Sequence, residues 1–174
     1  MRKFLFLGFA IQFVGLAHAQ QFDYPTRRAL IANICPAVKI ESFKFTNGTS
    51  KFISEFSWSN SGDKDVLAFE LVTVKFDPFN RSITGGRSVL PGHNSAKYEP
   101  LKPGEKDSDG SSSLASGAHT YTAFIYVRTV RFVDGTIWSF NAADLLKSIK
   151  AQAPDILEPG PLFPEPAKPT SSGV

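Results

Sequence analysis

The stretch VLAFELVTVKF, residues Val66–Phe76, decides the fold class. Nearly every position in it is apolar, and Asp77 and Pro78 follow at once, where proline cannot continue a strand ladder. This pattern predicts a central strand that is covered, at least in part, on both faces. Glu70 is the one acidic residue in the stretch, and we expect it to mark a β-bulge or to face water rather than to hold a raised pKa.

Strand patterns recur on both sides of this stretch. Residues 38–46 alternate in polarity and lead into Asn47-Gly48, a strong hairpin signal. Residues 51–59 then place three aromatic side chains on one face, namely Phe52, Phe56 and Trp58. Residues 121–133 form the longest regular strand pattern, with four apolar side chains on one face (Phe124, Tyr126, Val130, Phe132) and four on the other (Ala123, Ile125, Val127, Val133). A hairpin turn at Asp134-Gly135 returns the chain into residues 136–140.

Other segments carry weaker patterns. Residues 26–34 fit a short helix with Thr26 as its N-cap, and residues 82–84 and 87–90 fit short edge strands. The polar, glycine- and serine-rich residues 102–117 predict a mobile loop. Residues 141–150 predict a short helix, capped by Asn141 or Asp144, and the proline-rich residues after 153 predict a disordered or extended tail.

About seven short strands with turns between them predict an all-β protein: a single immunoglobulin-like antiparallel β-sandwich with a short C-terminal helix. The expected layout is a signal peptide at 1–19, a lead-in segment at 20–37, the sandwich with its terminal helix at 38–150, and a disordered proline-rich tail at 151–174. The 16 phenylalanines would fill the core.

The first residues predict export. Arg2 and Lys3 precede an apolar run at 4–16, and Ala17-His18-Ala19 supplies the small residues of a signal-peptidase site. The apolar run is shorter than the roughly 20 residues of a spanning helix. We therefore expect cleavage after Ala19 and a periplasmic or secreted protein. Cleavage would remove two of the 19 basic residues and leave them nearly balanced by 16 acidic ones, which argues against a nucleic-acid partner.

Cys35 is the only cysteine, so the chain forms no internal disulfide. The thiol could pair between chains or stay free, and we expect a small buried apolar side chain beside Ile34 and Pro36. The missing disulfide framework fits a bacterial periplasm better than an animal extracellular space.

Three stretches together carry a family resemblance: residues 56–60 (FSWSN), 66–77, and 130–138 (VRFVDGTIW). The set resembles the bacterial extracytoplasmic immunoglobulin-like sandwiches of the FxLYD type and related domains of unknown function, over about residues 38–140. The resemblance implies a periplasmic or surface location and a non-enzymatic role, and it brings no catalytic residues to carry over. The long segment 102–117 departs from the simplest pattern of that family.

Candidate ligand-binding residues are the aromatic side chains Trp138, Tyr126 and Tyr98. They would serve a ligand only if exposed, and a core position is the expected one for Trp138 and for Trp58. No catalytic residue is predicted, because the chain has no Gly-x-Ser-x-Gly sequence and no cysteine with a matched histidine.

No metal site or cofactor is predicted either. Residues 107–110 (DSDG) resemble the start of a calcium loop, but residues 111–118 supply no acidic ligand to complete it. His93 and His119 stand at no metal-ligand spacing to each other or to the cysteine.

These observations favour an exported, non-enzymatic sandwich that binds an unknown protein partner. A small-ligand or carbohydrate-binding protein is the first alternative, and an enzyme of unrecognised type is the second.

Overall fold

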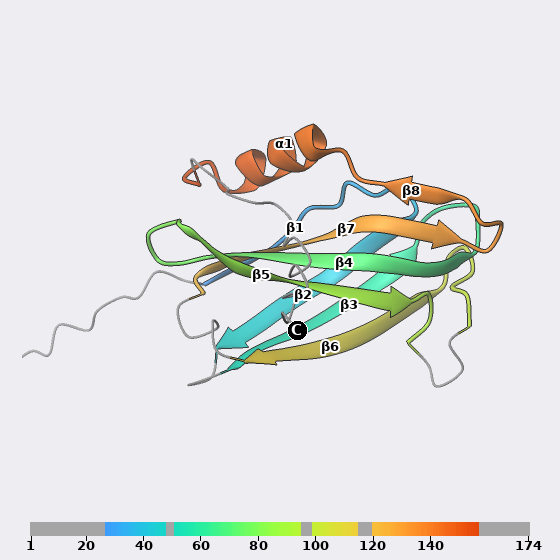
Figure 1. The fold of residues 1–174 in the computed structure, drawn as a ribbon, viewed down its shortest axis with the longest axis horizontal. Coiled ribbons are helices and arrows are strands. Elements are labelled where there is room, and N and C mark those ends of the chain that lie inside the picture. The colour runs from blue at the N-terminus through green and yellow to red at the C-terminus, as the bar shows by residue number, and fades with distance from the viewer. Residues whose placement is uncertain (1–26, 48–50, 95–98, 115–119, 157–174) are drawn as a thin grey trace, which may run out of the picture.

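The computed structural model describes residues 27–47, 51–94, 99–114 and 120–156. These form two layers of strands with one helix packed on the outside (Figure 1). The strands are β1 (Arg28–Ile31), β2 (Val38–Asn47), β3 (Lys51–Asn60), β4 (Val66–Phe76), β5 (Ser82–Pro91), β6 (Lys106–Leu114), β7 (Thr122–Phe132) and β8 (Ile137–Ser139), and the helix is α1 (Ala142–Gln152).

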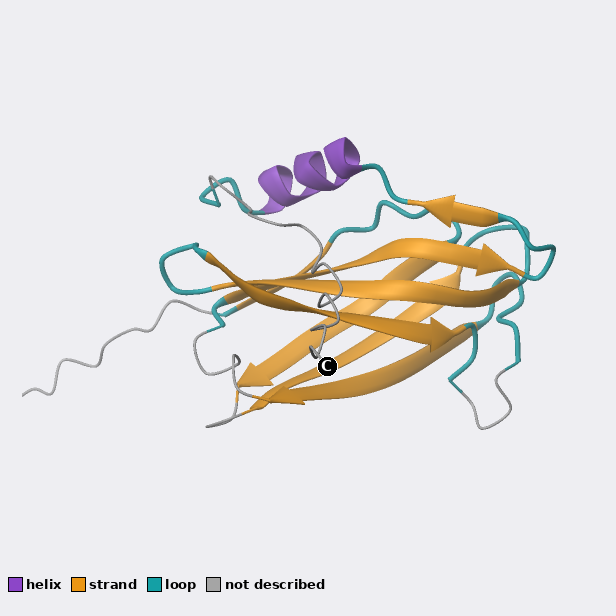
Figure 2. Ribbon diagram, viewed as in Figure 1, coloured by secondary structure: helices purple, strands orange, loops and turns teal. Residues whose placement is uncertain are grey.

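The larger sheet has the order β1-β7-β4-β5, and β8 also pairs with β7. The smaller sheet has the order β2-β3-β6. All pairs are antiparallel except β1 with β7, which run parallel. Figure 2 shows the helix lying over the outer face of the larger sheet. The predicted all-β sandwich with a short helix after its last strand is therefore confirmed, while residues 157–174 lie outside the described part.

The inner core fills the space between the sheets. Trp58 lies at the centre of this core and is 1% exposed. Its ring centre lies 5.3 Å from that of Phe69, in an edge-on arrangement. The predicted aromatic face of β3 is confirmed, because Phe52 and Phe56 are buried in the same cluster. Edge-on aromatic pairs add roughly 0.5–1.5 kcal/mol beyond the area they bury.

A second core lies between the larger sheet and α1. Leu145 and Ile149 of the helix pack on Val72 and Val74 of β4 and on their neighbours from β7. Asn141 caps the helix as predicted: its Oδ1 accepts a hydrogen bond from the backbone N–H of Ala143 at 2.8 Å. Because β4 is covered by one core on each face, its sequence is apolar at nearly every position, as predicted.

A bulge in β7 changes the predicted alternation of that strand. Glu70 pairs with Thr129 and Leu71 pairs with Val127, so Arg128 is an extra residue. The bulge moves Val130 and Phe132 to the inner core, although the sequence pattern placed them with Phe124 and Tyr126, which lie in the outer core. Glu70 was expected to mark a bulge or to face water: the bulge lies opposite it, in β7, and its side chain is only 13% exposed.

The predicted helix at residues 26–34 is wrong. Residues 28–31 form β1, whose Arg28 pairs with Thr122 and whose Ile31 pairs with Ile125. Leu30 contacts the outer core and Ile31 contacts the inner core, so successive side chains point to opposite faces as a strand requires. The lead-in therefore belongs to the larger sheet, and the folded region extends at the other end to the buried Ile156.

The predicted mobile loop at residues 102–117 is also wrong in its central part. Residues 106–114 form β6, an edge strand that pairs with β3 over its whole length. Small polar side chains are tolerated there, because an edge strand pairs on one side only and buries little apolar surface. The two predicted short strands at 82–84 and 87–90 form one strand, β5, which passes through Gly85; a Cβ there would meet the Thr73 carbonyl oxygen.

None of the helices among the described residues has the length and apolarity required to cross a membrane.

Candidate functional site

The predicted ligand-binding aromatics do not share a site. Tyr126 is fully buried beneath α1, with its ring centre 5.5 Å from that of Phe140, so it offers no surface to a ligand. Trp138 on β8 is half-buried against the inner core, on the opposite side of the larger sheet. Tyr98 lies outside the described residues. With Trp58 in the core as well, no platform of exposed tryptophan forms in the described part of the chain.

The outer face of the larger sheet is only partly covered by α1. Beyond the helix lies an open depression of about 280 Å³, here called the outer-face hollow, lined by Ala68, Phe69, Glu70, Val89, Thr129 and Arg131. Val89 is 68% exposed on this face. Ile137, which pairs with Arg131 on the neighbouring strand, is 60% exposed. Val89 lines the depression and Ile137 lies beside its Arg131 wall, so two exposed apolar side chains occur on this face.

Charged groups border the hollow. The Glu70 carboxylate forms ion pairs with Arg87 Nε at 2.7 Å on one side and with Arg128 Nη1 at 3.2 Å on the other. Its side chain is only 13% exposed, so the two guanidinium groups take the place of water around it. Arg131 adds a third positive charge, and the border carries three arginines against one glutamate.

The sequence pattern singled out Glu70 but did not predict its two arginine partners. Arg87 on β5 pairs with Val72 of β4, and Arg128 reaches the same face because it is the extra residue of the bulge. The pairing register brings these three side chains together, and a single chain's polarity pattern does not contain that register.

A second hollow lies between the two sheets, where the edge strands β5 and β6 face each other. This inter-sheet cleft holds about 150 Å³. It is lined by Phe52, Phe56, Leu71, Thr73, Lys75, Gly86, Arg87, Ser88, Ser111 and Ser112. Lys75 is 3% exposed, and its Nζ lies 3.9 Å from the ring centre of Phe52. Burial lowers the pKa of this ammonium group. The sequence analysis did not single out Lys75.

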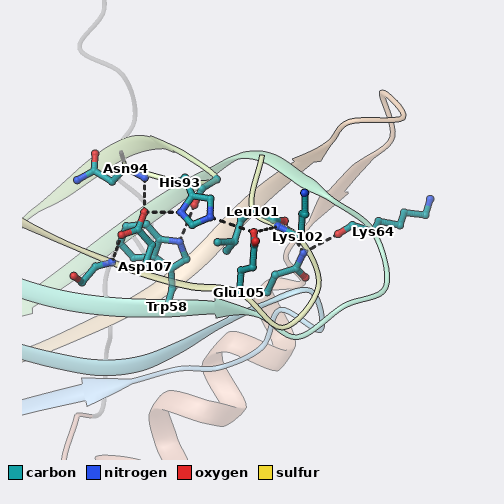
Figure 3. A network of polar contacts seen from close by, with 11 residues as sticks. Trp58, Lys64, His93, Asn94, Leu101, Lys102, Glu105 and Asp107 are labelled. Atoms are coloured by element: carbon teal, nitrogen blue, oxygen red, sulfur yellow. Dashed lines mark hydrogen bonds and ion pairs between the residues drawn. The ribbon is translucent and has the colours of Figure 1, made fainter. Parts of the chain in front are cut away.

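A polar network joins the end of β5 to the start of β6. Figure 3 shows the His93 imidazole between two carboxylates, with Nδ1 3.1 Å from Asp107 Oδ2 and Nε2 3.1 Å from Glu105 Oε2. Each carboxylate also accepts a backbone N–H, from Asn94 at 2.6 Å and from Lys102 at 2.7 Å. Burial opposes protonation of His93, but hydrogen bonds to Asp107 and then Glu105 raise its pKa overall.

We call this network the His93 clamp, because its hydrogen bonds hold the segment after β5 against the start of β6. Both ring nitrogens face acceptors, which suits an imidazolium that donates twice and leaves no ring nitrogen to act as a base. The described residues hold no group of three or more His, Cys, Asp or Glu side chains arranged to bind a metal ion. Residues 107–110, whose sequence resembles the start of a calcium loop without completing one, lie within β6, where Asp107 contacts His93.

Cys35 is buried in the inner core, as expected. Its sulfur accepts a hydrogen bond from the Val38 backbone N–H at 3.4 Å, and burial raises the pKa of the thiol. A buried, protonated thiol packs as a small apolar group.

Comparison with known proteins gives only weak structural similarity. No protein-family model matches the chain, and no curated protein matches it. A hypothetical protein from Peptoclostridium difficile 630 has a solved structure with a TM-score of 0.43 at 11% identity, covering 66% of this chain and 91% of that one. A "putative ApaA protein" from Bordetella pertussis gives a TM-score of 0.37 at 13% identity, covering 59% of this chain and 84% of that one. Neither similarity carries an argument about function.

Proposed function

We propose that the protein is exported and that its mature chain is a non-enzymatic sandwich module that binds a protein partner through the outer-face hollow. The observation that carries this proposal is the exposed apolar surface beyond α1, where Val89 and Ile137 flank a depression of about 280 Å³. Burial of both tryptophans against the cores, complete for Trp58 and partial for Trp138, weakens the carbohydrate-binding alternative.

The charges around the hollow favour an acidic partner segment. Glu70 is already neutralised by Arg87 and Arg128, so the border has a net positive charge to which Arg131 contributes. A complementary segment would place an apolar side chain in the hollow and acidic side chains against the arginines. Bidentate arginine–carboxylate contacts at the border would fix its orientation.

A random peptide-display library offers a direct test on the purified protein. We expect enrichment of peptides that contain an apolar residue flanked by Asp or Glu. Val89→Asp and Arg131→Glu should each abolish their binding, because the first puts a charge into the apolar contact and the second reverses the border charge.

Ile53→Asp is the matched control. Ile53 is 42% exposed on a strand of the other sheet, so the same change there should leave peptide binding intact. If the library yields no such peptides, or if they bind Val89→Asp as well as the unaltered protein, the outer-face hollow is not the binding surface.

Export rests on residues 1–19 and has its own test. N-terminal sequencing of protein recovered from producing cells should find Gln20 first. Ala19→Lys should prevent cleavage, because signal peptidase requires a small residue at that position. A mature protein that still begins at residue 1 would contradict the export proposal and leave the binding proposal untouched.

A further inference from the structure

β5 ends the larger sheet on the side away from β1 (Figure 1). It pairs with β4 along one edge, and none of the described strands pairs with its other edge. An unpaired strand edge is a template for a further strand, and proteins protect such edges with bulges, prolines, charges or covering loops. The register of β5 shifts before Gly86, and Pro91 ends the strand, but between them Val89 is 68% exposed. An exposed apolar side chain therefore lies beside an unpaired edge.

The ladder between β4 and β5 fixes which backbone groups of β5 face outward. The N–H of Gly92 donates to the Leu67 carbonyl oxygen at 2.9 Å, in the register that also pairs Ser88 with β4. Ladder bonds of an antiparallel pair recur at every second residue, so the backbone groups of Ser88 also point toward β4. The N–H and C=O groups of Arg87 and Val89 consequently point away from β4, toward the unpaired edge.

The side chains of these two outward-facing residues lie on the outer face of the sheet. Val89 lines the outer-face hollow, and Arg87 lies two residues before it, on the same face. Glu70 contacts Arg87 through Nε at 2.7 Å, and within the described part of the chain the two Nη groups form no ion pair. Because the Arg87 side chain is 38% exposed, its Nη groups are accessible to a further carboxylate.

We infer that an extended segment of the partner protein adds to β5 as an extra antiparallel strand, with an apolar side chain beside Val89 and a carboxylate beside Arg87. Val89 also lines the outer-face hollow, so this mode of binding rests on the proposed function and specifies how the partner's backbone is held. An added strand lies about 4.8 Å from β5, which brings directly opposite side chains into contact.

The antiparallel direction sets the order of the partner's residues. Antiparallel pairing is the more stable direction per residue, and β5 already pairs in this way with β4. A segment that runs against β5 meets Val89 before Arg87, so it reads apolar–x–acidic from its N-terminus. The side chain of x lies beside Ser88 at the inter-sheet cleft, where Ser111 and Ser112 of β6 add hydroxyl groups, and a small polar residue such as threonine suits it.

Two other occupants of the β5 edge fit less well. Antiparallel pairing with β5 of a second copy, centred on Ser88, would place the Arg87 side chains of both copies at neighbouring positions on one face, where like charges repel. Residues 157–174 include five prolines, and a proline has no backbone N–H to donate to the ladder. A proline-free segment of another protein forms more hydrogen bonds with β5.

The test uses the peptide acetyl-Thr-Thr-Val-Thr-Glu-Thr-Thr-amide and amide hydrogen exchange followed by NMR. In the protein alone, the amides of Arg87 and Val89 should exchange rapidly, because they point away from β4. At saturation with the peptide, exchange of both should slow at least about tenfold, because each amide then donates a ladder hydrogen bond. The amides of Ser108 and Gly110 on β6, the edge strand of the other sheet, should not change.

Modified peptides separate strand addition from side-chain contact. N-methylation of the peptide's Val or Glu removes an N–H that donates to β5 and should weaken binding at least about tenfold. N-methylation of the Thr between them is the matched control, and it should change the affinity by less than about twofold, since that N–H points away from β5. Peptides with Gln in place of Glu, or with the order Glu-Thr-Val, should each bind at least about fivefold more weakly.

Three results would overturn strand addition: unchanged exchange of Arg87 and Val89 at saturation, equal affinity of the N-methylated peptides, or equal affinity of the reversed peptide. Slow exchange of both amides before peptide is added would overturn it too, because the chain itself or a second copy would then occupy β5. Library peptides that bind and depend on Val89 without slowing these amides would preserve the proposed function alone. Absence of any peptide binding would remove both.

Discussion

Replacing Trp58 by phenylalanine should destabilise the protein strongly, and the structure indicates by how much. Trp58 is 1% exposed, and its Nε1 donates a hydrogen bond to the carbonyl oxygen of Gly92 at 3.0 Å. Trp58→Phe leaves that buried acceptor without this donor, at a cost of roughly 1–3 kcal/mol. The smaller ring also leaves a void, which at about 24 cal/mol per Å³ adds roughly 1 kcal/mol.

The expected total is about 2–4 kcal/mol, a large share of the roughly 5–15 kcal/mol that stabilises a typical domain. Urea and thermal unfolding of the purified protein measure it. Trp138→Phe is the matched control, because Trp138 is half-buried at the edge of the same core, and we expect a loss below about 1 kcal/mol. A Trp58→Phe variant that unfolds at the same urea concentration as the control would refute the reasoning.

Three further substitutions each test one feature of the structure through its effect on stability. Gly92→Ala should lower the free energy of unfolding by roughly 1–3 kcal/mol in urea titrations, because the added methyl group would meet backbone atoms, while Gly86→Ala has open space and should change it little. Lys75→Met should change how stability in urea depends on pH, while Lys44→Met, at an exposed position, should not. Because burial lowers the pKa of Lys75 in the folded state, the unfolded state binds more protons, so the unaltered protein should gain stability relative to Lys75→Met as pH rises toward 10.5; a difference constant with pH would contradict this. The two carboxylates raise the pKa of His93 above 6.5 in the folded state, so its stabilising contribution should be complete below that pH and disappear as pH rises through the folded value. His93→Gln should remove this pH dependence from thermal unfolding curves, and an unchanged profile would show that the clamp does not titrate.

The sequence predicted the elements whose own side chains decide their structure. Val66–Phe76 is apolar throughout because it lies between two cores, and the hairpin at Asp134-Gly135 follows from a glycine with φ of 85°. Asn141 begins α1 because its side chain satisfies a helix N–H, and that requirement is local. Such features depend on neighbours in sequence, so one chain contains enough information to find them.

The elements that were missed depend on partners far away in the chain. β1 has four residues and becomes a strand because β7 offers its edge, and β6 is a run of small polar residues ordered by its pairing with β3. The candidate sites were missed for the same reason. Lys75 is one charge in an apolar strand until Phe52 lies across from it, and Arg128 joins Glu70 only through the bulge.

The parallel pairing of β1 with β7 has a consequence for how the protein folds. Arg28 pairs with Thr122, and its guanidinium also binds the Asp155 carboxylate at 2.8 Å. Both contacts join the beginning of the folded region to its end, so the larger sheet cannot close until nearly the whole chain is available. Pairings of such high contact order fold slowly, on the order of milliseconds to seconds. The larger sheet can therefore be completed only after β7, α1 and Asp155 have left the ribosome.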